Sequence, residues 1–257
     1  MISSAQNYHY KRLRKLSNNK FNKKGKEFII EGIIEIDLAV KSNFKINKIY
    51  FREQKPFKFD IFLKKEIEIF YLKKNLFDLL TYRKKSSKLI AIAEKKNYTL
   101  NNIFLKKKSI LIIIENIEKP GNLGAILRTA NGMGVSGIII VDSKINVYNS
   151  NVIRSSVGSV FNLPIIKTNK EEAIKFLNKS KFNLYNTIIS NNSKNYLDVN
   201  YSGKIAIAFG SEDKGLSKKW KSFDADEICI KMNGENDSFN LSVSVGIILS
   251  EVVRQTK

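Results

Sequence analysis

Residues 110–114 are five consecutive isoleucines and leucines, and this run restricts the fold more than any other part of the chain. A short apolar run without alternating polar residues is typical of a strand that is buried on both faces of a parallel sheet. Similar runs follow at 137–142, 205–210 and 227–232, with segments of helical spacing between them. This alternation predicts an α/β domain whose mostly parallel sheet is covered by helices on both faces.

The first 95 residues contain a smaller pattern of the same kind. Their strand-like runs are 27–32, 46–51, 67–72 and 89–94. Residues 96–108 are rich in Lys and Asn and interrupt the pattern. We therefore expect a small α/β domain at 1–95, a linker at 96–108 and a second domain at 109–257.

The composition disfavours several kinds of chemistry. The chain has one cysteine, Cys229, and one histidine, His9, so we expect no disulfide framework, no metal site and no Ser-His-Asp triad. No apolar run approaches the roughly 20 residues that a membrane-spanning helix needs, and the N-terminus lacks the apolar stretch of a signal peptide. We expect a soluble, cytoplasmic protein in a reducing compartment, with no membrane partner.

The net charge of +21, from 45 Lys and Arg against 24 Asp and Glu, has two interpretations. It favours a polyanionic partner such as nucleic acid. The abundance of Lys, Asn and Ile is also what an AT-rich genome imposes on any protein, and RNA affinity that hardly depends on salt would favour that interpretation. Basic residues concentrate in the first third, at 11–15, 18–26 and 82–88.

Three segments of the second domain each end a predicted strand and continue into a polar loop that contains glycine. They are residues 115–140, 205–217 and 230–255. Ligands of open parallel sheets bind beyond the carboxyl ends of the strands, so these loops are expected to converge on one site.

Each loop also has an ordinary structural interpretation when it is taken alone. Arg128 projects from its predicted helix and is compatible with a surface salt bridge. Glu212 is compatible with an acidic residue at the start of a helix. Ser238, Asn240 and Ser242 crowd the start of the last helix, where any of them is a suitable N-cap.

In this order and at this spacing, the three segments closely resemble the three motifs of the SpoU/TrmH family of RNA ribose 2′-O-methyltransferases, within the SPOUT superfamily. Residues 151–165 look like the stretch between the first two motifs of this family. Residues 22–40 are similar to the start of an accessory RNA-binding domain, related in fold to a ribosomal protein, that many members carry. The resemblance implies methyl transfer from S-adenosylmethionine to a ribose 2′-hydroxyl, a deep trefoil knot in the C-terminal domain, and a homodimer whose site lies beside the interface.

The resemblance also implies roles for individual residues. The catalytic set falls on Asn122, Arg128, Glu212, Ser238 and Asn240. The cofactor contacts fall on Gly210, Ile230 and Phe239. Lys23 and Lys24 are the candidates for RNA binding in the first domain. Two positions depart from the pattern of many relatives: Lys231 replaces a proline and Phe239 replaces a leucine, and neither change removes a functional group.

Methyl transfer fits a chain without cysteine or histidine clusters, because an in-line displacement depends mainly on alignment and needs neither a metal nor a covalent intermediate. Guanidinium is almost always protonated, so we interpret Arg128 as a bidentate phosphate ligand that also stabilises the developing alkoxide. The group that accepts the proton stays unassigned.

Three functions remain open. An accessory domain of this kind favours ribosomal RNA, and large-subunit ribosomal RNA in particular, as the substrate. A transfer RNA 2′-O-methyltransferase is the alternative within the class. A catalytically silent RNA-binding or ribosome-assembly protein is the alternative outside it, and the complete set of motif residues argues against this third possibility.

Overall fold

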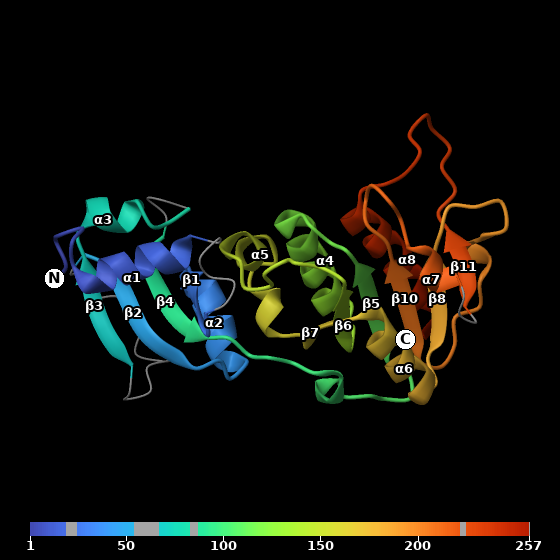
Figure 1. The fold of residues 1–257 in the computed structure, drawn as a ribbon, viewed down its shortest axis with the longest axis horizontal. Coiled ribbons are helices and arrows are strands. Elements are labelled where there is room, and N and C mark those ends of the chain that lie inside the picture. Colours follow the sequence, from blue (N-terminus) through green and yellow to red (C-terminus); the bar gives the residue numbers. More distant parts are fainter. Residues whose placement is uncertain (19–24, 54–66, 83–86, 222–224, 257) are drawn as a thin grey trace. The chain divides into compact units, whose positions relative to one another are not determined.

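The computed structural model describes residues 1–18, 25–53, 67–82, 87–221 and 225–256 (Figure 1). The chain divides into two compact units. Unit 1 comprises Met1–Lys96 and Asn146–Asn162, and unit 2 comprises Asn97–Ile145 and Leu163–Lys257. The boundary between the units is therefore not a single position near residue 95, because the segment 146–162 belongs to the same unit as the N-terminal part of the chain.

Unit 1 is built on a four-stranded sheet in the order β1-β4-β2-β3, in which only β2 and β3 are paired in parallel. Its elements are α1 (Tyr8–Ser17), β1 (Glu27–Glu31), α2 (Ile33–Lys41), β2 (Ile46–Arg52), β3 (Glu68–Leu72), α3 (Lys74–Asp78), β4 (Leu89–Glu94), α5 (Ser150–Ser155) and the 3₁₀ turn η3 (Ser159–Phe161). Leu13 and Tyr10 of α1 pack with Tyr50 and Ile92 in one apolar cluster, which attaches the first helix to the sheet.

Four aromatic rings explain why the segment 146–162 belongs to unit 1. Tyr148 stacks on Phe28 of β1 with ring centroids 4.5 Å apart, and Phe161 lies 5.0 Å from Phe44 by the same measure. All four residues are at most 7% exposed. Aromatic pairs at these separations bury large apolar areas, so the segment completes the core of this unit.

Unit 2 contains a seven-stranded sheet in the order β7-β6-β5-β10-β8-β11-β9, and all of its strand pairs are parallel. Its elements are η2 (Leu100–Asn102), β5 (Ile110–Glu115), α4 (Pro120–Gly132), β6 (Gly137–Val141), β7 (Ile165–Thr168), α6 (Lys170–Lys179), β8 (Asn183–Thr187), β9 (Lys194–Asn195), η4 (Tyr196–Asp198), β10 (Ile205–Phe209), α7 (Lys218–Lys221), β11 (Asp226–Cys229) and α8 (Leu241–Thr256). The predicted α/β class and mostly parallel sheet are confirmed.

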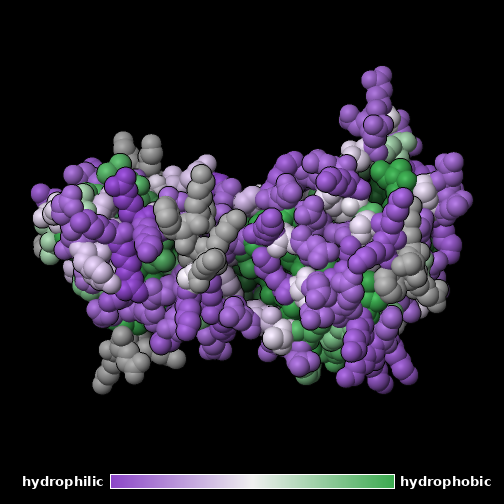
Figure 2. Space-filling view, in the orientation of Figure 1, coloured by the Kyte–Doolittle hydropathy of each residue, from purple (hydrophilic) through white to green (hydrophobic). Residues whose placement is uncertain are grey.

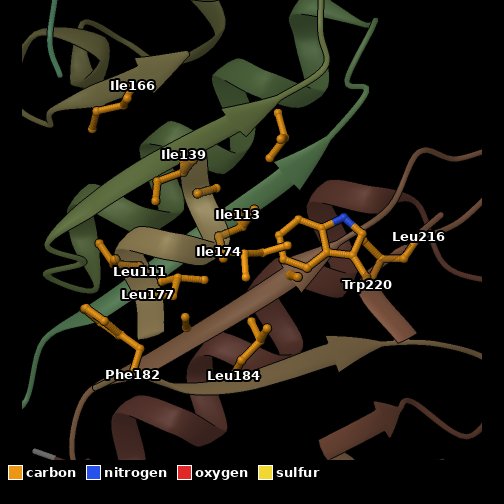
Figure 3. Close-up of a cluster of buried hydrophobic side chains, with 14 of the residues drawn as sticks. Leu111, Ile113, Ile139, Ile166, Ile174, Leu177, Phe182, Leu184, Leu216 and Trp220 are labelled. Atoms are coloured by element: carbon orange, nitrogen blue, oxygen red, sulfur yellow. The ribbon is translucent and has the colours of Figure 1, made fainter. Parts of the chain in front are cut away.

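The central strand β5 is buried on both faces. Leu111 and Ile113 belong to a cluster that also contains Ile174 of α6 and Trp220 of α7 (Figure 3). Residues alternate between the faces of a strand, so Ile112, which is fully buried, faces the opposite side. This double burial is the physical reason for the continuous apolar run in the sequence.

Polar residues dominate the visible surface (Figure 2). No helix in the part of the chain that the structure describes is long and apolar enough to cross a membrane. The segment between β11 and α8 extends away from the rest of unit 2 (Figure 1), and its residues 233–240 are all exposed.

Candidate active site

A tight loop follows β10 and returns to the end of that strand. Ser211 and Gly215 form an isolated bridge, and Gly215 adopts a positive φ of 64°, a conformation that favours glycine. A Cβ atom on Gly210 would lie 1.9 Å from the carbonyl carbon of Gly215 and 2.1 Å from the amide nitrogen of Leu216. Only glycine fits at position 210, because the backbone passes where a side chain would begin.

A buried ion pair anchors the far end of this loop to the sheet. Nζ of Lys170 lies 2.5 Å from Oε1 of Glu115, and both side chains are 7% exposed. The Ser217 amide donates to Oε2 of Glu115 at 2.8 Å, and Lys170 donates to Oγ of Ser217 at 2.6 Å. Burial alone would raise the pKa of Glu115, but the hydrogen bonds from Lys170 and Ser217 outweigh it and hold that pKa below its usual value.

Apolar packing supports the same stretch. Leu216 and Trp220 both lie in the cluster between the sheet and α6 (Figure 3), and Trp220 is fully buried. The loop from 210 to 217 is therefore fixed at both ends, by backbone contact at Gly210 and by a buried polar network with adjacent apolar packing at Ser217.

The three loops that the sequence singles out converge on Glu212. Its carboxylate accepts hydrogen bonds from Nδ2 of Asn122 and from Nζ of Lys119, both from the start of α4. Nδ2 of Asn240, at the start of α8, lies 3.2 Å from Oε1 of Glu212 and 3.3 Å from Oδ1 of Asn122. The structure thus brings together one residue from each predicted motif.

Asn240 has two functions in this arrangement. Its Oδ1 atom accepts hydrogen bonds from the Ser242 amide at 2.9 Å and from the Ser242 hydroxyl at 2.7 Å, which is the pattern of a helix N-cap. Its Nδ2 atom points to Glu212 at the same time. Capping fixes the side chain, so the amide is held in position for the polar cluster.

A cavity of about 430 Å³ opens beside this cluster. It is lined by the carboxyl ends of β8, β10 and β11, by the residues that follow these strands, and by the start of α8. Gly210, Ile230 and Phe239, the predicted cofactor contacts, all line it, as do Ser238 and Glu212. The volume falls within the range of about 300–1,000 Å³ that is typical of small-molecule pockets.

A smaller cavity of about 170 Å³ adjoins the first. Asn122 and Lys119 line it, and Ser211, Glu212 and Lys214 border both cavities. Glu212 therefore lies between the two cavities. The larger cavity is lined mainly by loops and apolar side chains, and the smaller one mainly by polar residues.

Two parts of the site were not recognised from the sequence. Lys119 directly precedes the predicted motif-one helix, and its hydrogen bond to Glu212 raises the pKa of its ammonium group. Thr187 ends strand β8, Ile188 and Ile189 follow it, and the position of β8 next to β10 puts all three in the cavity wall. The sequence signal for Lys119 was a basic residue directly before Pro120. The signal for residues 187–189 was their position at the carboxyl end of a strand.

Other predicted residues lie apart from the cluster. Arg128 is exposed on α4, six residues after Asn122, and among the described residues no hydrogen bond or ion pair joins it to Asn122, Glu212 or Asn240. Lys23 and Lys24 lie outside the described residues.

Comparison with known proteins agrees with this geometry. Residues 109–250 match the model of the SpoU rRNA Methylase family, and these residues are more than half of the chain. The chain belongs to the SpoU rRNA methylase family. Residues 7–91 of this SpoU-family protein also match the MRM3-like substrate binding domain.

Individual relatives extend over nearly the whole SpoU-family chain. It is 25% identical to the 23S rRNA (guanosine(2553)-2′-O)-methyltransferase RlmP of Bacillus subtilis, over 96% of this chain and 97% of the relative. An AdoMet-bound rRNA methyltransferase from Sinorhizobium meliloti superposes with a TM-score of 0.90 at 25% identity, covering 98% and 97% of the two chains. A TrmH/SpoU tRNA modifying enzyme from A. aeolicus superposes with a TM-score of 0.51 at 27% identity, but covers only 58% of this chain and 76% of its own.

Proposed function

We propose that this SpoU-family protein transfers a methyl group from S-adenosylmethionine to a ribose 2′-hydroxyl of RNA, and that the RNA is ribosomal. The observation that carries the proposal is the convergence of Asn122 and Asn240 on Glu212, whose side chain lies at the wall of the 430 Å³ cavity. Two relatives that match nearly the whole chain are named rRNA methyltransferases, whereas a tRNA modifying enzyme that also matches covers 58% of it.

The larger cavity suits S-adenosylmethionine. The missing side chain at Gly210 leaves loop backbone in the wall, and such backbone offers donors and acceptors to a nucleoside. Ile230 and Phe239 add apolar surface for a planar base. We assign these three residues to cofactor binding. When bound, S-adenosylmethionine supplies an activated methyl group to the acceptor oxygen.

The adjoining polar cavity is the proposed site of the acceptor ribose. Asn122 and Asn240 orient the carboxylate of Glu212, and Lys119 balances its charge. A fixed polar cluster of this kind positions a hydroxyl for in-line displacement, and that alignment supplies much of the rate enhancement. Ser238 lines the cofactor cavity, and we assign it to the reaction as well.

Arg128 faces away from the polar cluster of its own chain, so we place its role at the contact with a second protomer. Six residues along α4 correspond to a rise of about 9 Å and a rotation of about 240° from Asn122, so the two side chains leave different faces of the helix. We propose a homodimer in which the exposed Arg128 grips a phosphate of the bound RNA beside the interface. Arg128→Lys keeps the charge without the planar fork, so near-normal turnover in that variant would overturn this role.

The remaining features of the family belong to the same proposal. Residues 1–95 would bind the RNA substrate, with Lys23 and Lys24 as phosphate contacts, residues 96–108 would link the domains, and residues 109–257 would form a knotted, metal-independent methyltransferase domain. We also propose a cytoplasmic location, since the proposed substrate is ribosomal RNA. Matches to both the methylase and the substrate-binding models support this division of labour.

The decisive experiment is mass-spectrometric mapping of ribose methylation in ribosomal and transfer RNA from cells with and without the gene. Loss of one 2′-O-methyl group from large-subunit ribosomal RNA is the expected result. Loss confined to transfer RNA would keep the chemistry and overturn the substrate. If no methyl group is lost and calorimetry detects no S-adenosylmethionine binding, the silent RNA-binding alternative replaces the enzyme.

A further inference from the structure

Unit 1 contains a cavity of its own, of about 480 Å³, which none of the predicted catalytic or cofactor-binding residues lines. Its floor is apolar and buried, and includes Ile29 of β1, Ile90 of β4 and Ile153 of α5. Five separate stretches of the chain contribute to the wall: the end of α1, β1, residues 79–82, β4 and the segment 148–154. The volume is typical of pockets that receive small ligands or single groups of larger ones.

A planar pair stands at the rim of this cavity. The guanidinium carbon of Arg154 lies 4.0 Å from the ring centroid of Tyr82, which is a cation–π contact. Arg154 is itself held by Asn151, whose Oδ1 atom accepts from Nη2. Tyr82 is 71% exposed although it lines a cavity, so its ring remains accessible to a further planar group.

The backbone at Tyr82 is fixed as well. Its amide donates to Oε2 of Glu31 at 2.9 Å, across 51 residues of sequence. Glu31 and Asn151 both line the cavity and provide oxygen and amide groups at its edge. An aromatic ring held at the mouth of an apolar pocket, with polar groups around it, is the arrangement that proteins use to bind an unstacked base.

The surrounding charge suits a polyanion. The last turn of α1 carries Arg14 and Lys15, and the next two residues, Leu16 and Ser17, line the cavity. A nucleotide whose base entered the pocket would carry its phosphate past this basic turn or past Arg154. The shape favours a single unpaired nucleotide, because a base that is still paired in a helix cannot insert into a cavity.

We propose that this cavity, which we call the unit 1 pocket, binds the base of one unpaired nucleotide of the RNA substrate by stacking on the Tyr82–Arg154 pair. The inference rests on the proposed function, since it assumes an RNA substrate. The pocket is built from both matched regions of the chain. Tyr82 lies in the region that matches the substrate-binding domain, and Arg154 lies in the region that matches the methylase family.

Binding of fluorescently labelled RNA octamers to the full-length protein tests the proposal. Tyr82→Ala is expected to weaken binding of single-stranded octamers by about tenfold or more, as found for other aromatic stacking platforms, and to change the affinity for an RNA duplex less than twofold. Tyr82→Phe keeps the ring and should bind like the unmodified protein. Arg154→Lys keeps the positive charge but loses the planar guanidinium group, so its affinity for single-stranded octamers should lie between those of the unmodified protein and Tyr82→Ala.

Tyr8→Ala is the matched control. Tyr8 is 68% exposed, lies in the same unit and has Arg12 as a neighbour, with 3.4 Å between its hydroxyl and Nη1, but it does not line the pocket. Equal losses in Tyr8→Ala and Tyr82→Ala would overturn the proposal, as would a Tyr82→Ala protein that binds single strands within twofold of normal. Photocrosslinking of an octamer that contains 4-thiouridine should map to Tyr82 or to residues 148–154, and crosslinks found exclusively elsewhere would also overturn it.

These measurements separate the pocket from the enzyme. RNA binding is measured without methyl transfer, so a failure of the proposed reaction leaves the binding result interpretable. Conversely, if the unmodified protein methylates ribosomal RNA and Tyr82→Ala has the same KM for that RNA, the pocket proposal fails while the proposed function stands.

Discussion

Nζ of Lys170 and Oε1 of Glu115 are 2.5 Å apart in a part of unit 2 where each side chain is only 7% exposed. The pair belongs to different layers of the fold, since Glu115 ends strand β5 and Lys170 begins helix α6. Both residues hold Ser217, and through it the loop that carries Gly210 and Glu212. Glu115 and Lys170 therefore act as positioning residues for a site that they do not line.

Removing one charge of this pair should destabilise the protein and the loop together. Glu115→Gln leaves the ammonium of Lys170 buried with weaker compensation, and we expect a loss of about 3 kcal/mol in the free energy of unfolding. S-adenosylmethionine affinity should fall with it, while RNA affinity stays unchanged. Glu171→Gln is the matched control, because Glu171 and Lys219 form an exposed pair. Similar melting temperatures for the two variants would contradict this account.

The same pair predicts a pH dependence. The pKa of Glu115 is lower in the folded chain than its ordinary value of 4.5. A group of this kind stabilises the fold at pH values above the unfolded pKa, and its contribution disappears as the pH falls through the folded pKa. The difference in melting temperature between the unmodified protein and Glu115→Gln should stay constant from pH 8 to about pH 5.5 and shrink below about pH 4.5. If this difference in melting temperature grows as the pH falls, the pKa of Glu115 is raised in the folded protein and not lowered.

Gly210→Ala should displace the cofactor loop. The added methyl group would overlap the backbone at Gly215 and Leu216, so the loop has to move, at a cost of about 1–3 kcal/mol in stability. We expect the affinity for S-adenosylmethionine, measured by calorimetry, to drop about tenfold or more. Gly132→Ala is the control, because a Cβ atom there meets nothing within 4 Å. Unchanged cofactor affinity in Gly210→Ala would remove this loop from the binding site.

Substitutions of Asn240 should separate its two roles. Asn240→Asp keeps the oxygen that caps α8 but loses the amide donor and places a second carboxylate beside Glu212. We expect nearly normal thermal stability with turnover reduced about tenfold or more. Asn240→Ala should lose about 1 kcal/mol of stability in addition, because the cap disappears. If Asn240→Asp retains full turnover, the contact with Glu212 has no catalytic role.

The sequence predicts the elements of the fold well, for a physical reason. Strands such as β5 and β6 are buried on both faces, so nearly every residue in them is apolar and the signal is strong. The meeting of Asn122, Glu212 and Asn240 was also predictable, because parallel strands put their following loops at one edge of the sheet.

Other parts of the structure leave little trace in the sequence. Residues 146–162 look like a continuation of the second domain, and only the three-dimensional packing of Tyr148 and Phe161 on the first sheet assigns them to unit 1. The Glu115–Lys170 pair is similarly hidden, because its partners are 55 positions apart and each resembles a surface charge. Long-range pairing of this kind depends on topology, which composition and periodicity do not specify.

The aromatic contact between Phe28 and Tyr148 also has a consequence for how the protein is made. Chains are synthesised from the N-terminus at about 5–20 residues per second, so residues 1–96 leave the ribosome several seconds before residues 146–162 follow. During that interval Phe28 and Phe44 lack the rings that cover them in the finished protein. The first unit to be synthesised can therefore complete its core only after strand β5, helix α4 and strand β6 of unit 2 have been synthesised.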